Sequence, residues 1–125
     1  MRTWEEQQKL YNQGRTPESK AKGEKIVTNA KPGSSYHNYG LAIDFCKDSD
    51  IKKLGLQPDW KESSYKLLAE TAKGMGLQPG LYFSSIIDAP HIQFKLPPNV
   101  TLGVMSEWYE AGKFDRVWKE LDKRI

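Results

Sequence analysis

Residues 35–44 read SYHNYGLAID, so a histidine, a glycine and an aspartate stand at set spacings where an apolar run begins. Asp44 follows His37 by seven positions, and Gly40 lies between them. Residues 41–45 are rich in β-prone side chains and predict a strand that carries Asp44. We expect Gly40 to permit a close approach between the His37 loop and this strand, because glycine has no Cβ.

The second histidine of the chain, His91, also has an aspartate nearby. Asp88 precedes it by three positions, and the alanine and proline between them predict a turn before a short strand. Two imidazoles and one carboxylate form a ligand set that catalytic zinc sites use, with a fourth position left for water. A further carboxylate that does not bind the metal can act as a general base. On residue types alone, two histidines near aspartates are usually ordinary surface or core residues.

The spacing of these residues resembles two motifs of a known family. Residues 35–44 match S-x-H-x-x-G-x-A-x-D, the first zinc motif of the D-Ala-D-Ala carboxypeptidase (VanY-like) metallopeptidases. Residues 88–91 resemble their second motif, in which an acidic residue three positions before a histidine acts as base. Residues 2–7, 10–16 and 27–33 resemble the L-alanyl-D-glutamate endopeptidase branch, which includes phage endolysins and bacterial cell-wall lysins.

The resemblance implies a set of roles for the candidate residues. One zinc ion would be bound by His37, Asp44 and His91, and Asp88 would take a proton from the attacking water. The implied reaction is hydrolysis of the stem peptide of peptidoglycan between L-Ala and D-Glu. A D,D- or L,D-carboxypeptidase acting at the stem terminus is the alternative within the same class. A cell-wall-binding module that has lost catalysis is the alternative outside it.

Two further residues have implied roles that depend on the start of the chain. Arg2 would contact the substrate or the oxyanion, and Ser35 would help to orient the substrate or a ligand. Relatives usually have a further helix and strand before the arginine, so we expect this chain to lack that layer. Because chain ends fray unless they are held, we also expect Arg2 to be poorly ordered.

The resemblance implies a D-Ala-D-Ala metallopeptidase-like (hedgehog-like) fold, and the pattern of the chain agrees with an α+β class. We expect a single domain over residues 1–125, with a small antiparallel sheet that carries the zinc site and helices at its flanks. The expected helices cover residues 4–12, 59–73, 101–112 and 114–121, and an exposed loop covers residues 15–23. The expected strands cover residues 26–28, 41–45, 81–83 and 91–94.

Composition and charge exclude several classes of protein. The chain has 125 residues, one cysteine and a net charge of +3, so we expect no internal disulfide and no multi-cysteine zinc finger. No apolar run is long enough for a membrane span, and the chain opens without a signal peptide. A DNA-binding helix-turn-helix pattern is also missing. The family resemblance, together with the missing signal peptide, implies an enzyme that stays in the cytoplasm until it is released to the cell wall. We expect a monomer, and a phage or prophage origin stays open.

The basic surplus and the single cysteine each allow two interpretations. Residues 1–31 hold seven basic and four acidic side chains, which would favour an anionic polymer such as the cell wall or would form a solvated loop. Cys46 lies two positions after Asp44, on the same predicted strand face. It is expected to be a small buried hydrophobic residue, and the alternative is a thiolate near the metal.

Overall fold

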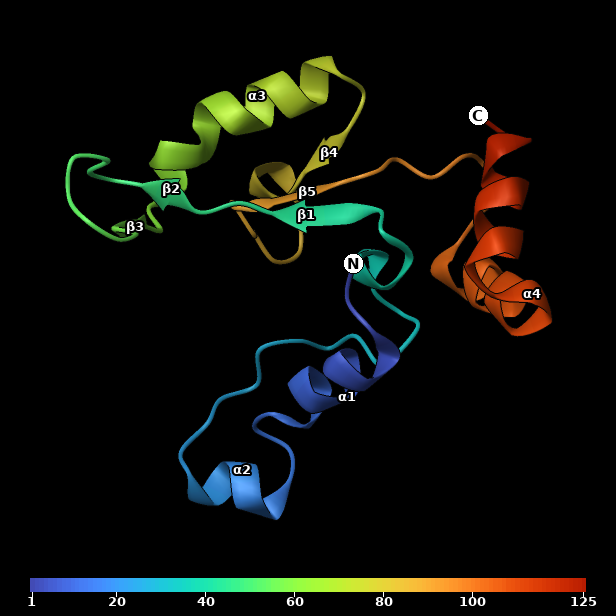
Figure 1. Ribbon diagram of the computed structural model, residues 1–125, viewed down its shortest axis with the longest axis horizontal. Helices are drawn as coiled ribbons and strands as arrows, with labels where there is room; N and C mark the ends of the chain where they lie inside the picture. The colour runs from blue at the N-terminus through green and yellow to red at the C-terminus, as the bar shows by residue number, and fades with distance from the viewer. The chain divides into compact units, whose positions relative to one another are not determined.

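The computed structural model describes residues 1–125 and divides into two compact units. The first unit combines residues 1–41 with residues 96–125, and the second unit holds residues 42–95 (Figure 1). Helices and small antiparallel sheets are both present, which confirms the predicted α+β class. No helix is both long enough and apolar enough to cross a membrane.

Two capped helices form the framework of the first unit. Helix α1 (Trp4–Asn12) begins where the Thr3 hydroxyl accepts the Glu6 backbone N–H at 3.0 Å, and the Glu6 carboxylate accepts the Thr3 N–H in return. This reciprocal pair satisfies two backbone donors at the helix start. Helix α4 (Leu102–Asp122) begins at Thr101, and its backbone leaves helical geometry at Gly112 and Lys113. The predicted bounds of α1 and the predicted break between residues 112 and 114 are confirmed, and the helix predicted from residue 101 begins at Leu102, after its Thr101 cap.

The core of the first unit is aromatic and aliphatic. Trp4 on α1 stacks on Tyr109 of α4 with ring centroids 4.2 Å apart, and it meets the edge of Tyr39 at 5.5 Å. The core therefore joins the start of the chain to its last helix. Its buried members are Tyr39, Val100, Met105, Val117 and Leu121.

Two predictions for the first unit are wrong. Residues 17–21 form a short helix, α2 (Pro17–Ala21), instead of a loop, because Thr16 caps it and a proline occupies its first position. Residues 26–28 form no strand, and Ile26 and Val27 are each 56% exposed. A short β-prone run becomes a strand only where a partner strand supplies its hydrogen bonds.

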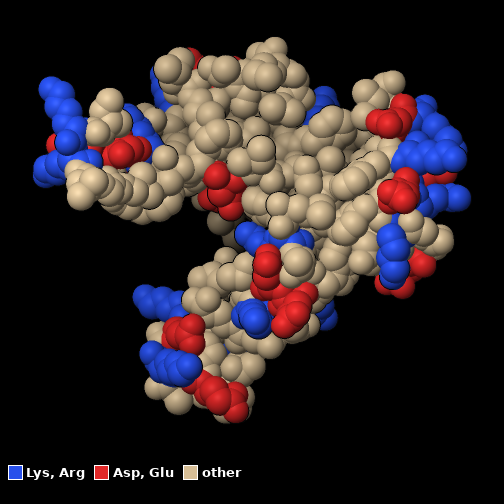
Figure 2. All heavy atoms as spheres, in the orientation of Figure 1, with Lys and Arg blue, Asp and Glu red and all other residues tan.

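Charges of both signs are mixed on the first unit. Figure 2 shows acidic and basic atoms side by side over α1, α2 and the end of α4. In α4 the Glu120 carboxylate, largely covered by its neighbours, accepts from Arg124 at 2.8 Å and from Lys123 at 3.1 Å. The pKa of Glu120 is lowered to about 2, because hydrogen bonds from Arg124 and Lys123 favour the carboxylate.

The second unit is built on a three-stranded antiparallel sheet in the order β1-β5-β4. Strand β1 (Ala42–Asp44) pairs with β5 (His91–Gln93), and β5 pairs with β4 (Gln78–Pro79). The register places Asp44 opposite His91 and Gln78 opposite Gln93. A separate hairpin joins β2 (Lys47–Asp48) to β3 (Pro58–Asp59).

The helices of the second unit differ from the prediction at their starts. Helix α3 (Lys66–Gly74) follows a 3₁₀ turn, η2 (Glu62–Tyr65), so the helix begins later than residue 59. Asp59 belongs to β3, and its carboxylate instead accepts from the Lys61 N–H and the Ser64 hydroxyl. The helix ends at Gly74, one residue beyond the predicted end at residue 73. The predicted strand over residues 81–83 is wrong, because this segment lies in a 3₁₀ turn, η3 (Gly80–Tyr82).

Candidate metal centre

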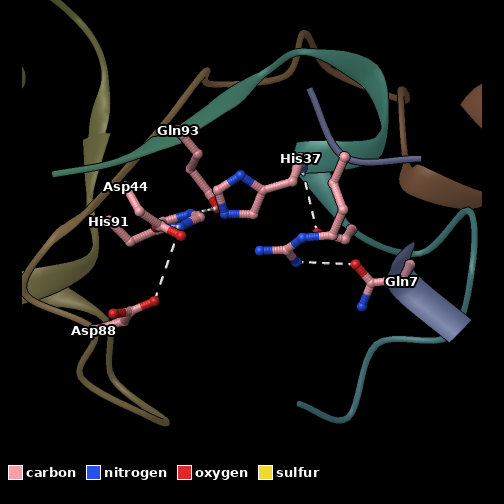
Figure 3. Close-up of polar contacts among 8 residues, drawn as sticks. Gln7, His37, Asp44, Asp88, His91 and Gln93 are labelled. Atoms are coloured by element: carbon pink, nitrogen blue, oxygen red, sulfur yellow. Dashed lines mark hydrogen bonds and ion pairs between the residues drawn. The ribbon is translucent and has the colours of Figure 1, made fainter. Parts of the chain in front are cut away.

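Asp44 and His91 lie side by side on paired strands of the second unit. Their residues are directly opposite each other in the β1–β5 ladder, and Nδ1 of His91 lies 3.1 Å from Oδ1 of Asp44 (Figure 3). The His91 side chain is only 10% exposed, whereas that of Asp44 is 49% exposed. The pair therefore has one buried, well-packed member and one member open to solvent.

Asp88 reaches the same histidine from the turn before β5. Its Oδ2 lies 3.8 Å from Nδ1 of His91, and its side chain is 54% exposed. Two backbone hydrogen bonds of 3.0 Å hold the turn: Asp88 N–H donates to the Gly80 carbonyl, and His91 N–H donates to the Asp88 carbonyl. The predicted turn at residues 88–90 is thus present, and it places a second carboxylate beside the Asp44–His91 pair.

Gly80 is required by this turn for a reason of space. A Cβ on Gly80 would lie 2.1 Å from the Asp88 carbonyl oxygen and 3.0 Å from Cβ of His91. No side chain fits at such a distance, so the turn that carries Asp88 can pack on η3 only at a glycine. Gly80 was not among the predicted site residues, although a glycine following a proline is a signal of irregular backbone.

The other ring nitrogen of His91 has a partner on its own strand. Nε2 of His91 lies 2.8 Å from the side-chain oxygen of Gln93, and the Gln93 amide NH₂ donates to the Gln78 side-chain oxygen at 3.0 Å. Gln78 and Gln93 are opposite each other in the β4–β5 ladder. Neither glutamine was among the predicted site residues, because only the strand register brings them to the histidine.

The environment of His91 favours its protonated form when only protein groups surround it. Burial lowers the pKa of His91, but hydrogen bonds to Asp44 and Gln93 and the negative charges of Asp44 and Asp88 outweigh burial, so its pKa is raised. These are the same acidic groups that would face a cation bound at this place. The surroundings of the Asp44–His91 pair therefore favour positive charge, either on the imidazole or on a bound cation.

The Asp44–His91 geometry suits two ligands of one zinc ion. Zinc–nitrogen and zinc–oxygen bonds of about 2.0–2.1 Å place two tetrahedral ligands roughly 3.3 Å apart. The observed separation of 3.1 Å between Nδ1 and Oδ1 is close to that value. A donor set of imidazole and carboxylate is also one that zinc accepts.

His37 belongs to the first unit, where local structure determines its backbone. It lies in a 3₁₀ turn, η1 (Tyr36–Tyr39), whose cap is Ser35, with the hydroxyl accepting the His37 N–H at 3.3 Å. Gly40 ends this turn with a φ of +72°, in the left-handed region. The predicted reason for Gly40 is wrong, because an added Cβ would meet only the Met1 sulfur at 3.6 Å. The left-handed backbone, and not a close approach, favours glycine there.

Arg2 is held in place within the first unit, contrary to the expectation of a frayed end. Its backbone N–H donates to the His37 carbonyl at 2.8 Å, and its carbonyl accepts from the Asn38 amide at 3.1 Å. Its guanidinium donates to the side-chain oxygen of Gln7 at 2.9 Å (Figure 3). Gln7 and Asn38 are both fully buried. Neither Gln7 nor Asn38 was among the predicted site residues.

Cys46 is exposed, so the prediction of a small buried residue is wrong. The strand β1 ends at Asp44, and the alternation that placed both side chains on one face ends with it. The structure thus groups the candidate residues by unit. Asp44, Asp88 and His91 meet in the second unit, whereas Arg2 and Ser35 contact His37 in the first.

The comparisons with known proteins agree with this chemistry. The model of the VanY family, described as D-alanyl-D-alanine carboxypeptidase, matches residues 1–83, and the chain therefore belongs to the VanY family. The predicted resemblance is thereby confirmed. The match includes the motif with His37 and Asp44 and ends before Asp88 and His91.

An individual relative is the peptidoglycan L-alanyl-D-glutamate endopeptidase CwlK of Bacillus subtilis (strain 168). It is 41% identical over 102 residues, which cover 74% of this chain and 55% of the relative. The chain thus spans about half the length of the curated relative it matches.

Proposed function

We propose that this chain is a zinc-dependent peptidase that hydrolyses the stem peptide of peptidoglycan at the L-Ala–D-Glu bond. The observation that carries the proposal is the Asp44–His91 pair, with ligand atoms 3.1 Å apart and the Asp88 carboxylate 3.8 Å from the same ring nitrogen. Membership of the VanY family and the similarity to CwlK support the choice of peptidoglycan as substrate.

His37 would be the third protein ligand of the zinc ion. Each of His37, Asp44 and His91 offers one ligand atom, and three protein ligands are the usual number in a catalytic zinc site. The motif spacing supports this role, because only residues 38–43 separate His37 from Asp44. When bound, zinc would supply Lewis acidity, which polarises the scissile carbonyl and makes water more acidic.

Asp88 would be the general base. Its carboxylate is half exposed, so substrate and water can approach it, and the turn at Gly80 limits its movement. It would accept a proton from the attacking water and deliver that proton to the leaving amine. Arg2 would stabilise the negative charge that develops on the carbonyl oxygen, since Gln7 and Asn38 hold it in one position.

A cavity of the second unit offers a place for the peptide. It has a volume of about 400 Å³, and Phe83 and Gln78 line it together with Lys73 and Lys95. His91 does not line this cavity, but the ring of one lining residue, Phe83, lies 5.7 Å from the His91 ring. Stem peptides carry free carboxylates, and the two lysines would attract them.

A D-alanyl-D-alanine carboxypeptidase is the second candidate, and the description of the family model favours it. The test is digestion of purified peptidoglycan, with mass spectrometry of the fragments. New L-Ala carboxyl ends and D-Glu amino ends support the endopeptidase. Release of D-Ala supports the carboxypeptidase, and binding without any product would identify a wall-binding module.

A matched pair of variants makes this digestion specific to the site. Asp88→Asn removes the proposed base and should abolish most of the cleavage. Asp50→Asn changes an aspartate in the loop that joins β2 to β3 and should leave the cleavage unchanged. Equal activity in the parent and in Asp88→Asn would overturn the assignment of the base.

A further inference from the structure

The hydrogen bonds around His91 form a continuous chain across the sheet of the second unit. Nε2 of His91 lies 2.8 Å from Oε1 of Gln93 (Figure 3), and Nε2 of Gln93 lies 3.0 Å from Oε1 of Gln78. All three residues belong to β4 or β5, and the strand register determines their spacing. Each residue of this hydrogen-bonded series is therefore held by the backbone pairing of the sheet.

The direction of these hydrogen bonds determines which end of the Gln93 amide faces the histidine. Because the Gln93 NH₂ group donates to Gln78, its carbonyl oxygen is the atom directed at His91. An amide oxygen can only accept, so Nε2 of His91 must carry the proton. In the neutral ring the lone pair then belongs to Nδ1, the nitrogen that lies beside Asp44.

We propose that Gln93 is a positioning residue, held by Gln78, which keeps His91 in the tautomer that presents Nδ1 to the metal. The proposal rests on the proposed zinc site, because it concerns how one ligand of that site is prepared. Metal-binding histidines commonly donate their other N–H to a carboxylate or carbonyl, which fixes the ring orientation and raises ligand basicity. Here a neutral side-chain amide would serve that purpose, and a second amide would prevent the first from turning over.

The role of Gln78 follows from the other possible orientation of the Gln93 amide. If the Gln93 amide turned over, its NH₂ group would face Nε2, and His91 would carry its proton on Nδ1 toward Asp44. That tautomer forms a favourable hydrogen bond to the Asp44 carboxylate but cannot bind a metal through Nδ1. The Gln78 oxygen accepts from the Gln93 NH₂ group, so the Gln93 amide could turn over and keep this hydrogen bond only if the Gln78 amide turned as well. If the amide were turned, metal binding would have to turn the Gln93 amide back and move the His91 proton from Nδ1 to Nε2.

The test is the zinc dissociation constant of the full chain, measured by competition with a chromogenic chelator at neutral pH. Gln93→Leu should weaken zinc binding by about 10- to 100-fold, the usual effect of losing such a partner. Gln93→Glu should retain the parent affinity, because a carboxylate also accepts the Nε2 proton. Gln78→Leu should weaken binding less than Gln93→Leu, and Gln57→Leu, in the segment before β3, should leave it unchanged.

A spectroscopic measurement separates positioning from a general loss of structure. Long-range ¹H–¹⁵N spectra of the histidine rings should show His91 with its proton on Nε2 in the zinc-loaded parent. The melting curves of the metal-free Gln93→Leu and parent proteins should coincide within a few degrees. Parent-like zinc affinity in folded Gln93→Leu, or a proton on Nδ1 of His91 in the loaded parent, would overturn the proposal.

The result also distinguishes this inference from the proposed function. If the parent binds no zinc, or if His91→Ala binds zinc as the parent does, the zinc site itself fails. If the parent binds zinc, His91→Ala loses it and Gln93→Leu keeps it, only the positioning role of Gln93 fails.

Discussion

Replacement of Gly80 by alanine is the sharpest test of how the second unit positions its acidic groups. The new Cβ would lie 2.1 Å from the Asp88 carbonyl oxygen, whereas ordinary contacts begin near 3.4 Å. The turn would therefore have to retreat by about 1.3 Å. That movement would also break the 3.0 Å hydrogen bond between the Asp88 N–H and the Gly80 carbonyl.

The loss of stability in Gly80→Ala follows from the steric clash and the broken hydrogen bond. Overpacking of this kind costs about 1–3 kcal/mol, and a lost backbone hydrogen bond adds roughly 0.5–1.5 kcal/mol. We expect Gly80→Ala to lower the free energy of unfolding by about 1.5–4.5 kcal/mol. A displacement on the order of 1 Å in a catalytic group can cost about 10²-fold in rate, so the cleavage of peptidoglycan should fall by a similar factor.

Gly74→Ala is the matched control for this substitution. Gly74 is the last residue of α3, and an added Cβ would meet nothing within 4 Å. Alanine favours helix by up to about 1 kcal/mol over glycine, so this variant should be as stable as the parent or slightly more stable. Urea unfolding of the metal-free proteins measures the stability of the Gly80→Ala and Gly74→Ala variants. Equal stability and equal activity of Gly80→Ala and the parent would refute the packing argument.

Three further predictions concern the ligands, the base and the acidic cluster of α4. His37→Ala and His91→Ala should each lose zinc at equimolar loading, and normal stoichiometry in either would remove that residue from the ligand set. Asp88→Asn should keep zinc and fold but lose about 10²- to 10⁴-fold in activity, and a parent-like rate would make Asp88 structural. Glu120 has its pKa lowered to about 2 from 4.5, so its charge stabilises the folded state above about pH 4.5 and this contribution disappears as the pH falls toward 2. In Glu120→Gln the melting temperature should depend less on pH across that range. The same pH dependence as in the parent would contradict the role of the Glu120 contact with Arg124.

The elements that the sequence alone determined are those held by neighbours in the chain. Thr3 and Thr101 cap their helices through residues three positions away, and the break at Gly112 needs no partner either. The two histidine motifs could be recognised for a similar reason, because their residue types and spacing lie within ten positions. Local hydrogen bonds and local steric limits depend on neighbouring residue types, so they can be inferred from the sequence.

The tertiary structure decided the features that depend on residues far apart in the chain. Asp59 belongs to a strand instead of the start of a helix because Lys47 pairs with it. The need for glycine at position 80 arises from the Asp88 carbonyl, and the role proposed for Gln93 arises from a strand register with Gln78. Capping and turn preferences are properties of a few consecutive residues, whereas strand pairing and close packing are selected by the whole fold, which brings those distant groups into contact.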